Sequence, residues 1–241
     1  MTIQNNYSFS PIGVIHSPYK QKFAIPRQPG LVTAAHGKLE LLLEQNQLEL
    51  VRDIEQHSHL WLIFVFHGTS EQGWKPLVKA PRLGGNKKTG VLATRSTFRP
   101  NPIGMSAVQL NGMCKINNNI ALEISGLDLL DGTPILDIKP YIPYSDRVEE
   151  ALSVMAPTPE NTNYCINFSL TAQQHLNLLA ANYQDLKLFI QQVLSQDPRP
   201  AYKKANTELQ EYGMSLYDLN IRWQIHHNQC TVLSIEKLNL V

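Results

Sequence analysis

Two stretches of this sequence place arginine side chains on backbone that proline and glycine constrain. Arg27 lies in the segment 26–30, PRQPG, and Arg95 and Arg99 lie in the stretch 81–104, PRLGGNKKTGVLATRSTFRPNPIG. Proline fixes φ, and glycine allows the backbone to approach a ligand closely. A guanidinium held on such backbone loses little conformational entropy when it binds a carboxylate or a phosphate. Both stretches therefore predict shaped loops that bind an anion, and an exposed basic loop with turn residues is the alternative.

The charge distribution supports an anionic ligand. The formal net charge is only +1, but residues 1–39 and 72–122 contain no Asp or Glu and carry charges of +4 and +8. If the two windows meet in space, they form a positive face suited to a polyanion or to a ligand with phosphate groups. The alternative is that they face different ways.

Length and composition indicate a soluble chain with a substantial core. The 241 residues, 43% hydrophobic and 17% charged, suffice for one large domain or for a domain with a smaller partner. The longest apolar run, 60–66, is too short to span a membrane, and the N-terminus has no signal-peptide pattern, so we expect a cytoplasmic protein without membrane contact. Its three cysteines are far apart and in no CxxC spacing, so they predict neither disulfides nor a zinc ribbon.

A group of histidines with one aspartate is a candidate metal site. Asp53, His57, His59 and His67 lie close in sequence. In a helix, however, residues two apart point in different directions, and the chain has no HExxH motif. We therefore predict no metal, and a metal hydrolase built on Asp53, His57 and His59 remains an alternative that metal analysis would test.

The elements that must position these residues read mainly as β-strands up to residue 147. Strands are predicted at 9–17, 38–43, 60–67, 89–94 and 104–110, with a short helix within 46–59. The continuous apolar run 60–67 predicts a strand buried on both faces. Segments 121–130 and 134–141, joined by an Asp-Gly turn, predict a hairpin. Residues 1–147 are thus expected to form a β-barrel whose loops hold the ligand at one mouth.

The C-terminal part reads as a small α+β domain, residues 164–241, after a linker at 148–163. Strands are predicted at 164–170, 216–224 and 231–238, and helices at 172–183 and 184–194. The loop between helix and strand places Asp197, Arg199 and Tyr202 beside two prolines. Stacking on an aromatic ring together with phosphate contact is a common way to bind unpaired RNA bases. An ordinary surface loop with a structural Asp–Arg pair is the alternative.

Several motifs carry a family resemblance that covers essentially the whole chain. The motifs are PRQPG at 26–30, SHLWLIFVFH at 58–67, PRLGGN at 81–86, TGVLATRSTFRPNPIGMS at 89–106, LDLLDGTPILDIKPYIPY at 127–144 and QDPRPAY at 196–202. With these motifs the sequence resembles the TrmO family, also called YaeB or TsaA-like proteins, of the two-domain bacterial type.

The resemblance implies a β-barrel methyltransferase that uses S-adenosylmethionine and acts on tRNA. Its implied reaction is methylation of the exocyclic nitrogen of threonylcarbamoyladenosine next to the anticodon, by a homodimer with the cofactor near the subunit contact. The absence of a GxGxxG motif agrees with a fold other than the Rossmann type. The implied cofactor-binding residues are Pro26, Arg27, Gln28, His67, Arg95, Met105, Ser125, Gly126, Leu127 and Asp128.

The reaction itself requires positioning more than acid–base machinery, because methyl transfer from a sulfonium is an in-line displacement. Asp128 is expected to bind the ribose or the amino group of the cofactor, while Arg27 and Arg95 bind its carboxylate, an RNA phosphate or the carboxylate of the threonylcarbamoyl group. Candidates for the proton acceptor are Asp137 and Tyr141. The residues assigned to the substrate are Arg99, Asn101, Asp197, Arg199 and Tyr202. A noncatalytic RNA-binding β-barrel is the alternative function.

Overall fold

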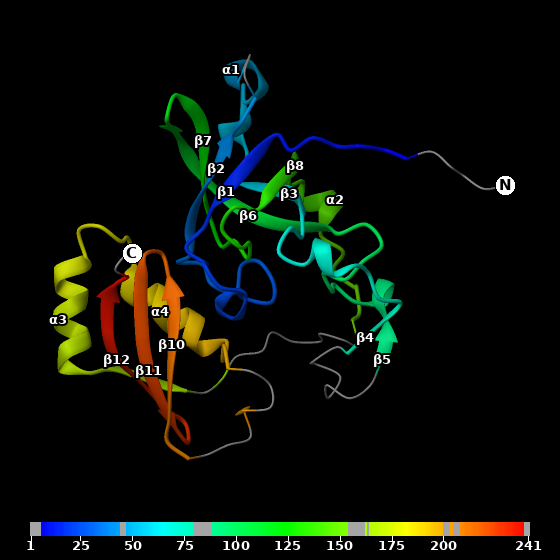
Figure 1. The fold of residues 1–241 in the computed structure, drawn as a ribbon. Helices are drawn as coiled ribbons and strands as arrows, with labels where there is room; N and C mark the ends of the chain where they lie inside the picture. Colours follow the sequence, from blue (N-terminus) through cyan, green and yellow to red (C-terminus); the bar gives the residue numbers. More distant parts are fainter. Residues whose placement is uncertain are drawn as a thin grey trace.

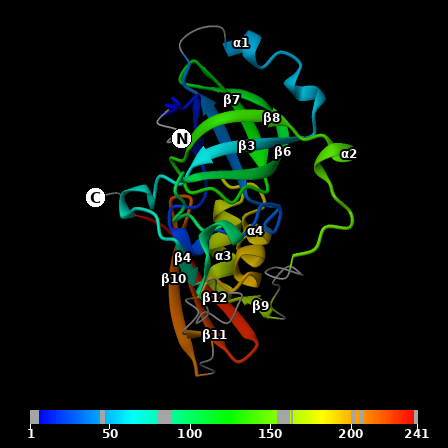
Figure 2. The ribbon, with the colours of Figure 1, turned by 90° about the vertical axis from the view of Figure 1, so that its right-hand side faces the viewer.

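The structure is a computed structural model that describes residues 6–43, 47–79, 88–153, 162, 164–199, 203–204 and 208–238. A six-stranded barrel and a four-stranded sheet with two helices make up most of the chain (Figure 1). Figure 2 shows the barrel above this C-terminal unit. In the described part, no helix is long and apolar enough to cross a membrane.

The barrel confirms the mainly β class that the sequence predicted. Its strands pair antiparallel in the order β1-β2-β7-β6-β3-β8, and β8 pairs with β1 to close the sheet. The strands are β1 (Gly13–His16), β2 (His36–Leu41), β3 (His59–Val65), β6 (Ile103–Ile116), β7 (Asn119–Ser125) and β8 (Pro134–Pro140). Closure leaves no free edge in this sheet, so segments far apart in sequence meet at its ends.

Strand β3 differs from its prediction. Its side chains alternate: Leu60, Leu62 and Phe64 are buried in the barrel, whereas Trp61, Ile63 and Val65 are partly exposed on the outside. The apolar run therefore has one buried face and one outward face, not two buried faces.

The predicted hairpin between β7 and β8 is wrong. Strand β7 pairs with β2 and β6, and β8 pairs with β1 and β3. The hairpin that does form joins β6 to β7 through Asn117 and Asn118, which have φ values of 47° and 76°. Two consecutive residues with positive φ match the turn that two-residue hairpins prefer. The Asp-Gly turn instead packs against β1, where Ser17 N donates to Asp131 Oδ1 at 2.7 Å.

Two other predicted elements are shorter than expected. Residues 89–94 form the end of strand β5 (Lys88–Gly90) followed by a single 3₁₀ turn, and β5 pairs with β4 (Leu77–Lys79) in a ribbon separate from the barrel. The helix expected within 46–59 is limited to α1 (Gln47–Leu50) and a 3₁₀ turn. Asp53, with φ of 66°, interrupts it because a helix requires negative φ. A further short helix, α2 (Pro143–Asp146), follows the barrel.

The C-terminal unit is an α+β arrangement, and both predicted helices are confirmed with shifted ends. Its sheet has the order β10-β11-β12-β9, and the predicted strand 216–224 spans a hairpin turn at Tyr217, whose φ is 54°. The elements are β9 (Cys165–Phe168), α3 (Leu170–Leu179), α4 (Leu186–Ser195), β10 (Gln210–Leu216), β11 (Leu219–His226) and β12 (Gln229–Lys237). Most of the linker predicted at 148–163 lies outside the described residues.

The segment between β1 and β2 is held between the barrel and helix α4. The buried ring of Tyr19 packs edge-on against Phe189 of α4, with ring centroids 5.7 Å apart. Ala34 N donates to Gln192 Oε1 at 2.9 Å, and Tyr217 N donates to Pro18 O at 2.7 Å. The barrel and the C-terminal unit thus share one hydrophobic cluster, which positions the loop that carries Arg27.

Candidate functional site

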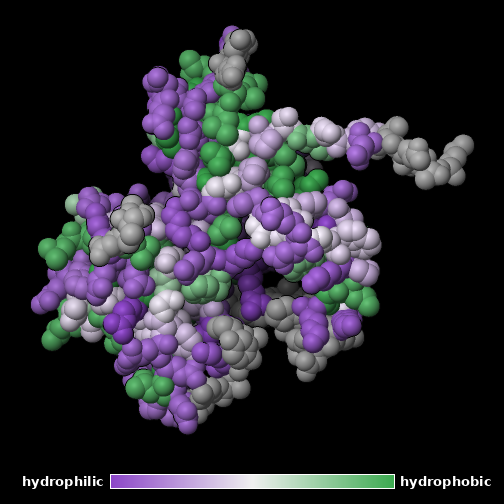
Figure 3. Space-filling view, viewed as in Figure 1, coloured by the Kyte–Doolittle hydropathy of each residue, from purple (hydrophilic) through white to green (hydrophobic). Residues whose placement is uncertain are grey.

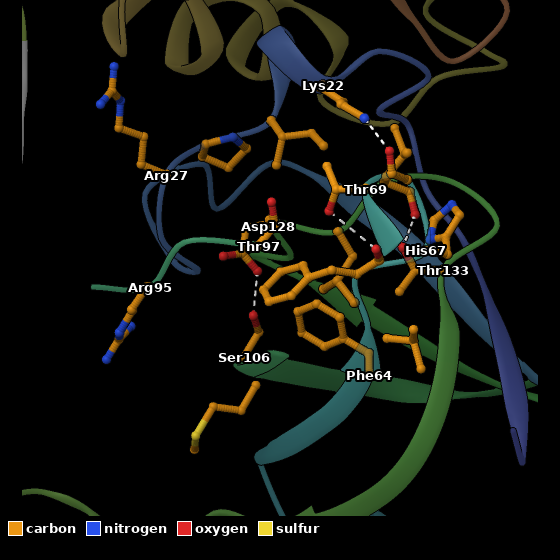
Figure 4. Close-up of a pocket in the computed structure, with 18 of the residues that line it drawn as sticks. Lys22, Arg27, Phe64, His67, Thr69, Arg95, Thr97, Ser106, Asp128 and Thr133 are labelled. Atoms are coloured by element: carbon orange, nitrogen blue, oxygen red, sulfur yellow. Dashed lines mark hydrogen bonds between the residues drawn. The ribbon is translucent and has the colours of Figure 1, made fainter. Parts of the chain in front are cut away.

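A cavity of about 320 Å³ lies where five segments of the N-terminal part meet (Figure 4). These segments are the loop after β1, the end of β3, the loop after β5, the start of β6 and the loop 126–133 between β7 and β8. Its volume lies in the range of small-molecule sites. Strand pairing in the barrel brings these segments together, although up to about 100 residues of sequence separate them.

The inner wall of the pocket is apolar. Phe64 and Phe66 line it with their rings edge to face, 5.3 Å between centroids, and Ile25, Leu129 and Leu130 add aliphatic surface. Gly104 on β6 lies against these rings, since a Cβ there would come within 2.5 Å of Phe64 ring atoms. The absence of a side chain at residue 104 therefore lets the aromatic wall pack tightly.

Asp128 places a carboxyl group against this apolar wall. Ser106 Oγ on β6 donates to Asp128 Oδ1 at 2.6 Å (Figure 4). Burial raises the pKa of Asp128 to about 6, although the hydrogen bond from Ser106 and the charge of Arg95 act to lower it. A carboxyl group with this pKa changes its charge near neutral pH and gains from a cationic ligand.

Two backbone hydrogen bonds hold the Asp128 loop against the Arg27 loop. Gly126 N donates to Ala35 O at 3.0 Å, and Gly30 N donates to Gly126 O at 2.8 Å. Gly30 and Gly126 have φ values of 77° and 72°, in the left-handed region that glycine adopts without strain. The two glycines thereby set the distance between the cationic loop and the carboxylate.

The two arginine loops predicted from sequence converge on this pocket. Arg27 and Arg95 both line it and lie on the same side in Figure 4. Arg95 Nη1 donates to Gln28 Oε1, which joins the two loops directly. Both guanidinium groups are exposed, so they can meet an incoming anion at the pocket mouth.

Seven of the ten predicted cofactor-binding residues line the pocket: Pro26, Arg27, Gln28, His67, Arg95, Met105 and Asp128. The other three do not line it. Ser125 and Leu127 are buried, and Leu127 belongs to the barrel core. Gly126 contributes through its backbone bonds rather than through the pocket surface.

The predicted proton acceptors lie elsewhere. Asp137 pairs in register with the outward residue Ile63, and its carboxylate lies 2.9 Å from Lys139 Nζ. The ring of Tyr141 packs against that of Trp61, 5.5 Å between centroids, also on the outer side of the barrel. Neither residue lines the pocket, because both project from the outer face of the sheet.

Two of the predicted substrate-binding residues form a buried ion pair. Asp197 and Arg199 are each only 6% exposed, with Arg199 Nε 2.8 Å from Asp197 Oδ1 and Arg199 Nη2 2.6 Å from the Tyr164 hydroxyl. Burial acts against ionisation, but the hydrogen bond from Arg199 holds the pKa of Asp197 below its ordinary value. Their burial favours the structural Asp–Arg pair that the sequence left open as the alternative, and contact of Asp197 and Arg199 with tRNA stays a prediction.

The remaining substrate assignments are mixed. Arg99 Nη1 donates to Thr94 O at 2.6 Å and so shapes the loop after β5, while Asn101 is exposed beside it. Tyr202 lies outside the described residues, as does the segment 81–87 of the glycine- and proline-rich stretch.

Sequence reasoning missed Ser106 and the aromatic pair. Ser106 occupies an inward position of β6, between the buried residues Gly104 and Val108, so a polar residue in a buried register was the signal. Phe64 and Phe66 were read only as part of an apolar run. Among the described residues, no group of three or more His, Cys, Asp or Glu side chains is arranged to hold a metal ion.

Two protein-family models match this chain. The model of the tRNA-methyltransferase O N-terminal domain matches residues 14–147. The model of the TrmO C-terminal domain matches residues 161–238. Together they cover both units of the fold.

Individual relatives agree with the family models. A tRNA (adenine(37)-N6)-methyltransferase of Escherichia coli (strain K12) is 47% identical over 232 residues, which are 96% of this chain and 99% of that protein. A Pseudomonas aeruginosa protein described as an S-adenosylmethionine-dependent methyltransferase is 46% identical over 90% of this chain and 92% of its own length. The crystal structure of TrmO from P. aeruginosa superposes with a TM-score of 0.79 at 39% identity, over 98% of this chain and 100% of that one.

Proposed function

The chain belongs to the TrmO family, and on this premise we propose that it transfers a methyl group from S-adenosylmethionine to N6 of adenosine 37 in tRNA. The observation that carries this proposal is the pocket in which two arginine loops and the Asp128 carboxyl group surround an apolar wall. The direct test is incubation of the protein with S-adenosylmethionine and tRNA, followed by mass spectrometry of the tRNA nucleosides. Because the proposed substrate is tRNA, we also propose that the protein acts in the cytoplasm.

The residues of the pocket fit the methyl donor. S-adenosylmethionine combines an aromatic base, a positively charged sulfonium and an amino acid group that carries a carboxylate. The apolar wall with Phe64 suits the base, Asp128 suits the positive charge, and Arg27 suits the carboxylate. When bound, the donor supplies a methyl group whose bond to sulfur breaks, with its electron pair left on sulfur, as the bond to nitrogen forms. The chain contributes by aligning both reactants and by limiting the reorganisation of water around them.

Replacing Asp128 with Asn is expected to weaken S-adenosylmethionine binding by about 10- to 100-fold at pH 8, the loss typical of a charged contact. The pKa of Asp128 is about 6 in the free protein, so its carboxyl group is mainly protonated and neutral below that pH. A cationic ligand binds the ionised form better, so wild-type affinity should rise as the pH increases through 6 and then level off. Calorimetric titration from pH 5 to 8 measures both effects.

The Asp128→Asn variant should lack this rise, whereas Glu149→Gln, at an exposed position, should behave as the wild type. Equal affinity of Asp128→Asn and wild type across the whole pH range would show that Asp128 does not face the positive charge of the donor.

We further propose that the substrate adenosine carries a threonylcarbamoyl group. This group ends in a carboxylate, and a guanidinium can bind a carboxylate through two parallel hydrogen bonds. Arg95 is exposed at the pocket mouth and oriented by Gln28, so it is the residue we assign to the modification. Arg27, which also lines the pocket, is the residue we assign to the carboxylate of the methyl donor.

Replacing Arg95 with Lys is expected to lower kcat/KM on threonylcarbamoylated tRNA about tenfold, because lysine keeps the charge but loses the paired hydrogen bonds. The Kd for S-adenosylmethionine should stay within about twofold of wild type, since a different residue holds the donor. Steady-state kinetics and calorimetry give the two quantities. Arg222→Lys, in an exposed ion pair of the C-terminal sheet, is the control.

Unchanged turnover in Arg95→Lys would contradict the assignment of Arg95 to the modification. An equal loss of donor affinity would reassign Arg95 to the donor. Equal kcat/KM on tRNA with and without the threonylcarbamoyl group would exclude this group as a recognition element while leaving N6-methylation intact.

We propose that the protein is a homodimer formed through the outer face of β3 and β6. Ile103 and Met105 are 41% and 56% exposed on β6, and they pair in register with the outward residues Val65 and Ile63 of β3. A second copy covering this apolar face would bury it as the core of a stable interface. Because Met105 also lines the pocket, the partner would sit beside the methyl donor.

In such a dimer, the outward-facing candidates for the proton acceptor would lie near the pocket of the other subunit and could take part in its reaction. Asp137 and Tyr141 lie on the same outer side as Ile63 and Trp61, next to the proposed interface. We propose that Asp137 of the partner subunit accepts the proton that leaves N6, so that each site combines a pocket from one subunit with a carboxylate from the other.

A further inference from the structure

A second, smaller cavity adjoins the pocket. It has a volume of about 110 Å³ and shares Thr69 and Thr97 with the larger pocket. Its other walls include Trp74, Arg99 and Pro102. A molecule in the main pocket and a ligand in this cavity would therefore lie side by side, separated only by the shared walls Thr69 and Thr97.

Trp74 presents an aromatic ring to solvent at this cavity. The residue is 57% exposed, although a ring of this size is usually well buried. Its neighbour Lys75 is fixed to the loop after β5, since Lys75 N donates to Phe98 O at 3.2 Å. The ammonium group of Lys75 lies 4.8 Å from the centre of the Phe98 ring. The backbone next to Trp74 is thus held by a hydrogen bond, and the Lys75 ammonium group is held over the Phe98 ring.

Positive residues predominate after Trp74 in the sequence. Residues 72–122 contain no Asp or Glu, and the exposed Glu71 is the nearest acidic residue before Trp74. Arg99 lines the cavity, Lys75 follows Trp74 with its ammonium group over the Phe98 ring, and the nearby β4–β5 ribbon pairs Lys79 with Lys88. Figure 3 shows a hollow below the barrel, between the C-terminal unit and the part of the chain at lower right, with hydrophilic side chains at its upper rim. An exposed ring among cations, beside the pocket proposed to hold the methyl donor, suits unpaired RNA.

We propose that the cavity at Trp74 is a subsite for a nucleotide next to the methylated adenosine, whose base stacks on the Trp74 ring and whose phosphate contacts Lys75 and Arg99. The proposal rests on the proposed function. An enzyme that methylates a base must take it out of its stack, which leaves the neighbouring base exposed. The shared walls Thr69 and Thr97 place this cavity next to the pocket proposed for the methyl donor, which the methylated adenosine must approach.

Replacing Trp74 with Ala is expected to raise the Kd for a tRNA anticodon stem-loop about 5- to 150-fold, the effect of losing one stacked base. Trp74→Phe keeps a ring and should stay within a few-fold of wild type. The tryptophan fluorescence of the wild type should be quenched when the stem-loop binds, and this quenching should be lost in Trp74→Phe. Fluorescence anisotropy of the labelled stem-loop gives the Kd.

Matched controls separate this subsite from the rest of the protein. Phe9→Ala removes another exposed aromatic ring and should leave RNA binding unchanged. The Kd for S-adenosylmethionine should be the same in Trp74→Ala and in the wild type. Methylation of tRNA by the wild type tests the proposed function separately, so that function can stand if the subsite fails.

Three outcomes would overturn the subsite. In the first, stem-loop affinity of Trp74→Ala lies within twofold of wild type. In the second, donor affinity falls by the same factor as RNA affinity, which would make Trp74 a wall of the donor pocket. In the third, Trp74→Ala changes the oligomeric state measured by light scattering, which would identify a protein partner as the occupant.

Discussion

A mixture of Arg95→Ala and Asp137→Asn subunits is expected to regain methyl transfer that neither variant supports by itself. Alone, Asp137→Asn should lose about 10²- to 10⁴-fold in rate, as enzymes do without their proton acceptor. Alone, Arg95→Ala should lose about 10- to 100-fold through a missing charged contact. Arg95 lines the pocket and Asp137 lies on the outer face, so one site of each mixed dimer would have both residues intact.

Random reassortment of equal amounts makes half of the dimers mixed, so the mixture should reach about a quarter of the wild-type rate. The two variants are mixed, dissociated and reassociated, and the rate is measured on threonylcarbamoylated tRNA. Light scattering on the wild type first establishes whether the protein is a dimer.

Arg95→Ala mixed with Asp128→Asn is the matched control. Both residues line the pocket of one protomer, so every site in that mixture carries a defect and no recovery is expected. Recovery in neither mixture would exclude a site shared between subunits. Full activity of Asp137→Asn by itself would exclude Asp137 as the proton acceptor.

Replacing Arg199 with Met should lower the free energy of unfolding by about 3–5 kcal/mol, the range observed when one partner of a buried ion pair is removed. The change leaves the Asp197 carboxylate buried without its bidentate partner, and it removes the bond to the Tyr164 hydroxyl. Urea unfolding followed by circular dichroism measures the difference. Arg222→Met, in an exposed ion pair with Glu211, should cost less than about 1 kcal/mol.

The stabilisation by this pair should also depend on pH with a definite sign. The pKa of Asp197 is lower in the folded protein than its ordinary value of 3.8, so the folded state favours the ionised form. The contribution is then present above that value and disappears as the pH falls through the folded pKa. Wild type and Arg199→Met should therefore converge in stability in acid. If Arg199→Met were as stable as the wild type but bound tRNA weakly, the result would show that Arg199 serves tRNA binding and not stability.

The parts of the site that sequence predicted were those whose conformation is local. In the segment 26–30, proline and glycine determine the backbone regardless of the rest of the fold, so Arg27 was found directly. The loop with Arg95 was found for the same reason. That both meet Asp128 depends on the closure of the barrel, which brings distant segments together, and local patterns do not encode it.

Where sequence reasoning failed, long-range contacts outweighed local preferences. The Asp-Gly turn was a strong hairpin signal, but Asp131 accepts hydrogen bonds from Ser17 N and from Lys20 Nζ, so it joins β1 to the loop before β8. Asp197 and Arg199 lie among prolines and resemble a surface loop. The positive φ of Asp197, 47°, helps to turn both side chains inward to Tyr164.

The insertion of Tyr19 and its neighbours between the barrel and helix α4 also restricts how this chain can evolve. A change in size at Phe189 would displace the Tyr19 ring and, through the same loop, the backbone at Arg27. Residues on α4 and in the segment between β1 and β2 should thus be inherited as matched sets. Chimaeras that join the N-terminal part of one relative to the C-terminal part of another should fold well only when both come with compatible residues at this seam.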